Sequence, residues 1–268
     1  MDLIPSAIMK KIILFICFLI CAYPLLAQDS SLYQRKIFVR NGDTLRYRIL
    51  YPENAKRGKA YPLLVFLHGS GERGSDNALQ LLHGGDLFLK PDLRKQFPAV
   101  VIFPQCPAND TWSKFPHPRD TSAAFNHLLN IGSLTTPEQL VKLLMDSLVG
   151  DKKIDKKRIY LGGLSLGGFG TYDLVIHYPF YFAAAFPICG QANVPLYVRT
   201  ASHVPIWIFH GAKDDVVNPQ PDRNLIKSLE AAGMKNAKYT EYPDANHNSW
   251  DSAFAEPDLM PWLFFQKK

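Results

Sequence analysis

The sequence predicts an α/β fold, with a mostly parallel central sheet, an N-terminal antiparallel hairpin and helices on both faces of the sheet. Three observations support this prediction: continuous apolar runs typical of strands buried on both faces, helix-compatible stretches that alternate with them, and a hairpin pattern near the start. The chain has 268 residues, of which 47% are hydrophobic and 20% charged. This is enough for one globular domain with a substantial core.

The first 27 residues are expected to be a signal peptide. Lys10 and Lys11 precede an apolar run that continues to Ala27, the order of a charged region, a short hydrophobic region and a small residue at a cleavage point. We place cleavage after Ala27, with Met9 as an alternative start, and residues 28–268 as the one globular domain. An uncleaved anchor is the rival interpretation, but the run is short for a span of ~20 residues. We therefore expect a secreted or periplasmic protein with no stable membrane anchor after cleavage.

Charge and cysteine content restrict the partners. The formal net charge is +6, and loss of Asp2, Lys10 and Lys11 with the signal leaves +5, spread along the chain. We expect no nucleic-acid partner, because no basic recognition module is visible. Cys106 and Cys189 remain in the mature chain, and the sequence leaves open whether they pair. No C-x-x-C or H-E-x-x-H spacing is present to support a metal site, so none is expected.

The first half of the chain supplies a hairpin and two buried strands. Residues 33–51 predict two strands around the turn Asn41-Gly42-Asp43, a strong hairpin signal. Residues 63–67 and 100–103 are continuous apolar runs, as in parallel strands covered by helices.

The second half alternates helices and strands. Thr135 or Thr136 is positioned to cap a helix that begins around Pro137, and the apolar residues that follow fit a 3.6-residue period. The other predicted strands are 158–161, 182–187, 205–209 and 237–242, and the other predicted helices are 169–177, 224–232 and 258–266. In such a sheet, ligands bind beyond the carboxyl ends of the strands.

One strand end carries a candidate nucleophile. The pentapeptide Gly163-Leu164-Ser165-Leu166-Gly167 stands between a predicted strand and a predicted helix. A serine on such a tight turn is held with its hydroxyl exposed at the sheet edge. We therefore predict Ser165 as a catalytic nucleophile.

Two later strand ends supply the base and the acid that a serine nucleophile requires. Asp214 follows the strand 205–209, and His247 follows the strand 237–242. Asp215 is the competitor for the acid, whereas Asp244 is less attractive because it shares the loop of His247. The chain order Ser165, Asp214, His247 predicts a catalytic triad.

The oxyanion formed by nucleophilic attack needs preorganised donors. The backbone N–H of Leu166, at the start of the helix after Ser165, is one candidate. The other is the N–H of Ser70, in the glycine-rich loop of residues 68–74. A simple structural loop is the alternative for this segment.

These motifs resemble those of secreted α/β-hydrolase serine esterases. The resemblance covers about residues 35–268, and it includes the esterase-D, feruloyl and acetyl-xylan esterase, poly(hydroxybutyrate)-depolymerase-like, phospholipase/carboxylesterase and "predicted peptidase" groups. It rests on four segments: 67–74, 154–168, 210–214 and 247–250. The sequence departs from these groups at Leu166, where methionine is common, and at Asn218, where proline is common.

The resemblance implies a cofactor-independent serine carboxylesterase that acts on acetyl or feruloyl esters of plant polysaccharide. An acylated polysaccharide or oligosaccharide is the expected partner. Trp250 and Trp112, with Phe115 and Tyr181, are candidates for a substrate platform, with ordinary packing as the alternative. Two other functions remain open: a serine exopeptidase or oligopeptidase of the same fold, and a non-catalytic binding protein.

Overall fold

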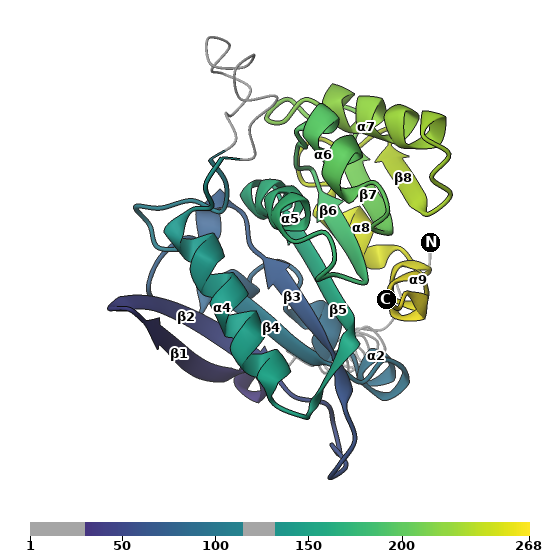
Figure 1. Ribbon diagram of the computed structural model, residues 1–268. Helices are drawn as coiled ribbons and strands as arrows, with labels where there is room; N and C mark the ends of the chain where they lie inside the picture. The colour runs from purple at the N-terminus through teal and green to yellow at the C-terminus, as the bar shows by residue number, and fades with distance from the viewer. Residues whose placement is uncertain (1–29, 115–131) are drawn as a thin grey trace, which may run out of the picture.

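The computed structural model describes residues 30–114 and 132–268, so the expected signal peptide and Phe115 lie outside the described residues. One eight-stranded sheet has the order β1-β2-β4-β3-β5-β6-β7-β8 (Figure 1). The strands are β1 (Gln34–Arg40), β2 (Asp43–Leu50), β3 (Tyr61–Leu67), β4 (Val100–Gln105), β5 (Ile154–Leu164), β6 (Ala184–Ile188), β7 (Ile206–Gly211) and β8 (Ala237–Tyr242).

The N-terminal hairpin prediction is confirmed. Strands β1 and β2 pair antiparallel, and Arg40 lies opposite Asp43 across a two-residue turn. Asn41 and Gly42 have φ angles of 53° and 89°, as a tight hairpin turn requires. β2 also pairs antiparallel with β4, which joins the hairpin to the parallel part of the sheet.

The parallel sheet prediction is also confirmed. Strands β4, β3, β5, β6, β7 and β8 run parallel to one another. Every residue of β3 and β4 is buried, because helices cover both faces of the sheet. The carboxyl ends of β3 to β8 therefore meet at one edge.

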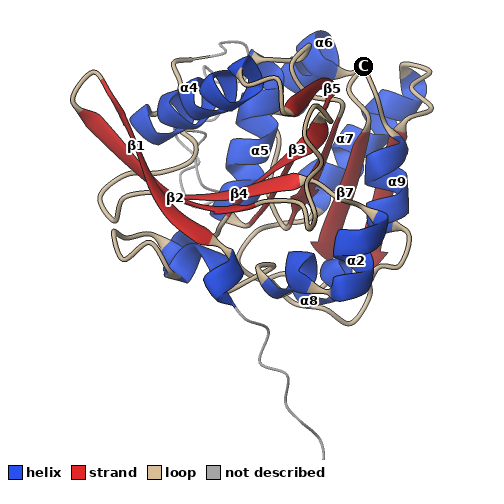
Figure 2. Cartoon of the chain, turned by 90° about the horizontal axis from the view of Figure 1, so that it is seen from below, coloured by secondary structure: helices blue, strands red, loops and turns tan. Residues whose placement is uncertain are grey.

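Two helical layers cover the sheet, as Figure 2 shows. One face packs against α4 (Thr136–Gly150), α5 (Leu166–His177), α6 (Val194–Ala201) and α7 (Gln220–Ala231). The other packs against α2 (Pro91–Gln96), α8 (Trp250–Ala255) and α9 (Leu259–Phe265). Within the described residues, no helix is both long enough and apolar enough to cross a membrane.

The predicted cap of α4 is confirmed, whereas α5 and α7 begin three and four residues earlier than predicted. Thr135 caps α4: its hydroxyl accepts from the Glu138 N–H, and the Glu138 carboxylate accepts from the Thr135 N–H. The sequence analysis missed α2, α6 and α8, whose six to eight residues are too short to display a full periodic pattern. For α6 a usable signal existed, because Asn193 caps the helix by accepting from the Leu196 N–H.

Candidate active site

The three residues of the predicted triad meet at the carboxyl edge of the sheet. Ser165 follows β5, Asp214 lies three residues beyond β7, and His247 lies five residues beyond β8. The His247 Nε2 atom is 2.9 Å from the Ser165 Oγ atom, and the His247 Nδ1 atom is 2.8 Å from the Asp214 Oδ2 atom. The sequence order and the parallel sheet together bring these side chains, up to 82 residues apart, into one hydrogen-bonded row.

The Ser165 turn is strained and closely packed. Ser165 has φ 51° and ψ −118°, a conformation that costs a non-glycine residue free energy. Its N–H donates to the Ile188 carbonyl at 2.9 Å. A Cβ on Gly163 would lie 2.3 Å from the Gly167 carbonyl oxygen, and one on Gly167 would lie 2.0 Å from the Leu67 carbonyl oxygen. Glycines are therefore required for α5 to start this close to β3 and β5.

The loop after β7 presents Asp214, not Asp215, to the histidine. Asp214 Oδ1 accepts from the N–H groups of Val216 and Val217 at 2.9 and 2.8 Å, which leaves Oδ2 directed at His247. Burial raises the pKa of Asp214, but hydrogen bonds from His210, His247 and Val217 outweigh it and hold that pKa well below its usual range. The carboxylate is therefore ionised, and the His247 Nδ1 atom carries a proton that it donates to Asp214. This leaves His247 Nε2 free to accept the serine proton.

The two competing acids have other partners. Asp215 is exposed, and its backbone N–H donates to Asn246 Oδ1 at 3.1 Å. Asp244 is paired with Lys213 at 2.7 Å on the exposed surface. Asn246 was not singled out from the sequence, although its side chain also accepts from the His247 N–H at 2.6 Å. Asn246 therefore joins the loop after β7, which holds Asp214, to the loop after β8, which holds His247.

The loop after β3 lies against the nucleophile. Ser70 opens the short 3-10 helix η2 (Ser70–Glu72), and a Cβ on the preceding Gly69 would lie 3.6 Å from the Ser165 Cβ atom. Leu166 is the first residue of α5, so its N–H has no acceptor within the helix. The structure thus places Leu166 directly after Ser165 and the Gly69-Ser70 segment against it, and the oxyanion role of the two N–H groups stays a prediction.

His68 anchors this loop as a neutral ring. Its Nδ1 atom lies 2.6 Å from the Gly69 carbonyl, and its Nε2 atom accepts from the Cys106 N–H at 3.0 Å. Burial lowers the pKa of His68 to about 4, so the ring is uncharged near neutral pH. It connects the loop after β3 to the end of β4.

Sequence reasoning missed two side chains next to the triad. The Glu72 carboxylate is buried, and its Oε2 atom would lie 3.0 Å from a Cβ on Gly69. His83 Nε2 is 3.7 Å from Glu72 Oε1, and the His83 ring packs on Trp250 with centroids 5.1 Å apart. We call Glu72, His83 and Trp250 the rim cluster. The turn-rich sequence around Glu72 and His83 carried no periodic signal that would have drawn attention to them.

The structure corrects part of the predicted substrate platform. Trp250 is partly exposed and packs edge-on against the His247 ring at 5.6 Å, so it remains available to a substrate. Trp112 is fully buried, and its indole N–H donates to the His68 carbonyl at 3.1 Å. Trp112 therefore supports the loop from inside and cannot contact a substrate. Tyr181 precedes β6 and so lies at the opposite edge of the sheet.

The two cysteines among the described residues, Cys106 and Cys189, are both free thiols. Cys106 follows β4 and Cys189 follows β6, three strand positions away in the sheet. That separation is about 14 Å at the usual strand spacing, beyond the ~7 Å reach of a disulfide. Cys189 Sγ lies within 4.8 Å of the ligand atoms of Asp214 and His247. Burial raises the pKa of this thiol well above its usual value, which makes it a poor metal ligand.

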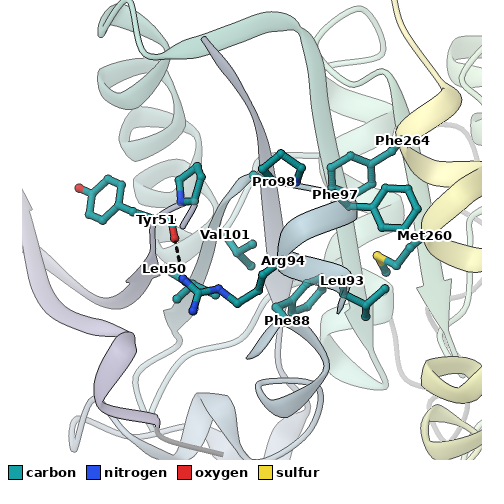
Figure 3. Close-up of a pocket in the computed structure, with 12 residues that line it drawn as sticks. Leu50, Tyr51, Phe88, Leu93, Arg94, Phe97, Pro98, Val101, Met260 and Phe264 are labelled. Atoms are coloured by element: carbon teal, nitrogen blue, oxygen red, sulfur yellow. Dashed lines mark hydrogen bonds between the residues drawn. The ribbon is translucent and has the colours of Figure 1, made fainter. Parts of the chain in front are cut away.

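Several hollows lie away from the triad. The pocket in Figure 3 has a volume of about 20 Å³ and lies among β2, α2, the start of β4 and α9, where Arg94 donates to the Tyr51 carbonyl at 3.3 Å. A cavity of about 440 Å³ lies near the starts of β3, β4 and β5. Both are at the amino edge of the strands. A third cavity, of about 230 Å³, lies at the carboxyl edge and is lined by polar residues including Arg46, Gln105 and Asn109.

The sheet and this row of side chains correspond to the α/β-hydrolase fold, and comparisons with known proteins agree. The family model described as phospholipase/carboxylesterase matches residues 130–256, which include Ser165, Asp214 and His247. A crystal structure of a thermostable esterase is 33% identical with a TM-score of 0.78, and the match covers 89% of this chain and 64% of that one. Within the α/β-hydrolase fold, the chain is therefore similar to esterases.

Curated relatives match smaller shares of longer proteins. A bifunctional acetylxylan esterase/xylanase of Neocallimastix patriciarum is 32% identical over 124 residues, 43% of this chain and 18% of that protein. An uncharacterized secreted protein of Arthroderma benhamiae is 23% identical over 266 residues, 85% of this chain and 26% of that protein. A ferulic acid esterase from Anaeromyces mucronatus, solved in complex with ferulic acid, shares the fold at 14% identity and a TM-score of 0.62, over 85% of this chain and 89% of that one.

Proposed function

We propose that the chain is a serine carboxylesterase that hydrolyses esters through an acyl-enzyme. One observation carries the proposal: His247 lies within hydrogen-bond distance of both Ser165 Oγ and Asp214 Oδ2, at 2.9 and 2.8 Å. Serine is a poor nucleophile unless a base accepts its proton and a third group orients that base. The likeness to esterases supports an ester as the bond that is broken.

In the first half-reaction, Ser165 Oγ attacks the ester carbonyl carbon and its proton passes to His247 Nε2. The carbonyl oxygen becomes an oxyanion, which the N–H groups of Leu166 and Ser70 stabilise. Asp214 stabilises the His247 imidazolium. The tetrahedral intermediate then breaks its bond to the alcohol oxygen, which receives the proton from His247 Nε2. The acyl group remains on Ser165 Oγ.

In the second half-reaction, water replaces the alcohol. His247 Nε2 accepts a proton from the water molecule as its oxygen attacks the acyl carbon. The bond to Ser165 Oγ breaks, His247 returns the proton to the serine oxygen, and the carboxylic acid leaves. The buried, ionised Asp214 acts in both halves by keeping His247 in the tautomer with a proton on Nδ1.

The substrate we propose is an acetyl or feruloyl ester of plant polysaccharide, met outside the cytoplasm after removal of residues 1–27. The named activities of the Neocallimastix and Anaeromyces proteins support this class. Two features of the chain agree with it. Trp250 in the rim cluster offers an aromatic face beside His247, and the polar cavity lined by Arg46 and Asn109 lies at the same edge. Secretion is supported by the Arthroderma protein, which is named as secreted.

The proposal is tested with Ser165→Ala and a matched control. We expect the variant to fold, to lose hydrolysis of p-nitrophenyl acetate, and to lose labelling by a fluorophosphonate probe. Ser228→Ala is the control, because Ser228 only bonds its own helix α7 through the Asn224 carbonyl and should retain both. Substantial residual turnover by Ser165→Ala would contradict the nucleophile assignment.

A substrate panel separates the alternatives. Acetylated xylan, methyl ferulate, short p-nitrophenyl esters and peptide anilides would be compared by kcat/KM for the wild-type enzyme. Preference for acetylated xylan or methyl ferulate supports the proposed substrate. Faster cleavage of peptide anilides would indicate a peptidase, and a wild-type protein that the fluorophosphonate does not label would indicate a binding protein.

A further inference from the structure

A second histidine, His210, also contacts the predicted acid of the triad. It is the penultimate residue of β7, and its side chain is fully buried. The His210 Nε2 atom lies 3.2 Å from Asp214 Oδ2, the same oxygen that His247 contacts. The His210 Nδ1 atom lies 2.7 Å from Asp222 Oδ2, on α7. The row of side chains therefore continues past the triad, from Asp214 through His210 to Asp222.

The partners of His210 determine where its protons are. The Nε2 atom also lies 3.0 Å from the Val217 carbonyl oxygen. A carbonyl oxygen and an ionised carboxylate only accept hydrogen bonds, so Nε2 must carry a hydrogen. Nδ1 faces the Asp222 carboxylate, whose other oxygen accepts from the Tyr172 hydroxyl at 2.7 Å. Burial lowers the pKa of His210, but hydrogen bonds with Asp214 and Asp222 outweigh it and raise that pKa to about 9.

The other ionisable groups around the pair do not supply a competing charge. Glu241 on β8 forms an ion pair with Arg223 on α7, and the Arg223 hydrogen bonds lower the pKa of Glu241. The remaining groups are neutral, because burial raises each pKa above its usual value: Tyr172 on α5, Tyr197 on α6, Tyr239 on β8, whose hydroxyl bonds Glu241, and Cys189 after β6. His210 is therefore the cation in contact with Asp214 when His247 is unprotonated.

We propose that His210, held by Asp222, is a positioning residue of the triad: as an imidazolium it fixes the Asp214 carboxylate and offsets part of the negative charge that His247 experiences. This inference rests on the proposed serine-hydrolase function. Because His210 and His247 share one carboxylate oxygen, each weakens the attraction that Asp214 exerts on the other. Removal of the His210 charge should therefore strengthen the hold of Asp214 on the imidazolium form of His247.

Two variants test this role by removing the positive charge of His210 while keeping most of the surrounding contacts. In His210→Gln, the side-chain amide keeps a donor near Asp214 but removes the positive charge. In Asp222→Asn, the shape and the Tyr172 contact are kept, and His210 loses the carboxylate that holds its second proton. Tyr172→Phe is the matched control, because it removes one hydrogen bond to Asp222 and leaves His210 between two carboxylates.

The measurements are the pH profile of kcat/KM and the NMR titration of the ring nitrogens of His210 and His247. We expect His210→Gln to move the acidic midpoint of both the profile and the His247 titration upward by about one pH unit, a tenfold change in proton affinity. We expect Asp222→Asn to move it in the same direction by less, and Tyr172→Phe to leave it unchanged. In the wild-type protein both His210 nitrogens should carry protons at pH 7, and in Asp222→Asn only Nε2 should.

Several results would overturn the inference. A lower activity of His210→Gln with an unmoved acidic midpoint would mean that His210 only supports the fold. A wild-type His210 with one bare nitrogen at pH 7 would contradict the imidazolium. A wild-type protein inert to esters would instead contradict the proposed function, while the two histidine titrations would still decide the charge relation between His210 and His247.

Discussion

Two loops at the carboxyl edge of the sheet begin alike and behave differently. Each follows a buried parallel strand, and a buried histidine followed by glycine stands at each junction: His68-Gly69 directly after β3, and His210-Gly211 as the last two residues of β7. Yet the pKa of His68 is lowered to about 4 and that of His210 is raised to about 9. The first ring is neutral near pH 7, and the second is a cation.

Burial alone therefore does not set the charge of a buried histidine. Both rings lose water, which disfavours the charged form. His68 has a backbone carbonyl and a backbone N–H as partners, so one proton satisfies it. His210 has acceptors at both nitrogens, two of them carboxylates, so two protons are needed. The histidine in the loop after β3 is thus held by uncharged backbone partners, and the histidine before the loop after β7 by charged ones.

The largest expected effect comes from the acid loop. Asp214→Asn should lower kcat by about 10⁴-fold, because an amide at this position favours the wrong tautomer of His247. The neighbouring Asp215→Asn is the matched control and should remain near wild type. The measurement is kcat for p-nitrophenyl acetate. A large loss in Asp215→Asn with a small one in Asp214→Asn would exchange the two assignments.

A smaller effect is expected in the oxyanion loop. His68→Phe removes both ring contacts and leaves the Cys106 N–H and the Gly69 carbonyl without them. A displaced Ser70 N–H should lower kcat by about 10-fold to 100-fold. Because His68 is neutral, the acidic midpoint of the pH profile should stay where it is in the wild type. If His68→Phe moved the acidic midpoint as far as His210→Gln is expected to, the assignment of His68 as neutral and His210 as charged would be contradicted.

The smallest effect is on the free energy of unfolding. The direction in which this free energy changes with pH differs between the two histidines. His210 has a raised pKa, so its stabilisation is fully present below about pH 6.5 and is lost as pH rises through about 9. His68 has a lowered pKa, so its stabilisation is present above about pH 6.5 and is lost as pH falls through about 4. Urea unfolding of the wild type, His210→Gln and His68→Phe from pH 4 to 10 measures how the free energy of unfolding depends on pH.

The His210 variant should flatten the alkaline side of the curve of unfolding free energy against pH, and the His68 variant should flatten the acidic side. Parallel curves would contradict the assigned charges.

Much of the fold follows from local sequence patterns. Apolar runs placed the buried strands, and the Asn41-Gly42 turn placed the hairpin. The order of the strand ends indicated Ser165, Asp214 and His247, because parallel strands bring their carboxyl ends to one edge. The acid could be chosen over Asp215 only as a preference, and the structure supplies the reason: two N–H groups orient the Asp214 carboxylate.

Other features depend on packing between distant segments, which local patterns do not encode. Trp112 was a candidate for substrate contact, yet its Cβ atom and carbonyl oxygen occupy the space beside Gly170 on α5. Asp222 was not singled out from the sequence, and only the packing of α7 places it against His210. Glu72 and His83 are eleven residues apart in turns, and meet because the loop folds back on itself.

Because Gly167 has no side chain, the backbone of α5 can lie directly against the loop after β3. This close packing limits how such a site can change during evolution or design. The α5 backbone touches the carbonyl groups of Leu67 and His68, so the serine turn and the loop with Ser70 form one packed unit. A substitution that shifts either segment also shifts the other. The positions of Ser165 and of the Ser70 N–H therefore cannot be changed separately. New substrate preferences are therefore best sought outside this unit, at residues such as Trp250 and His83, where side chains can be exchanged without moving the backbone that does the chemistry.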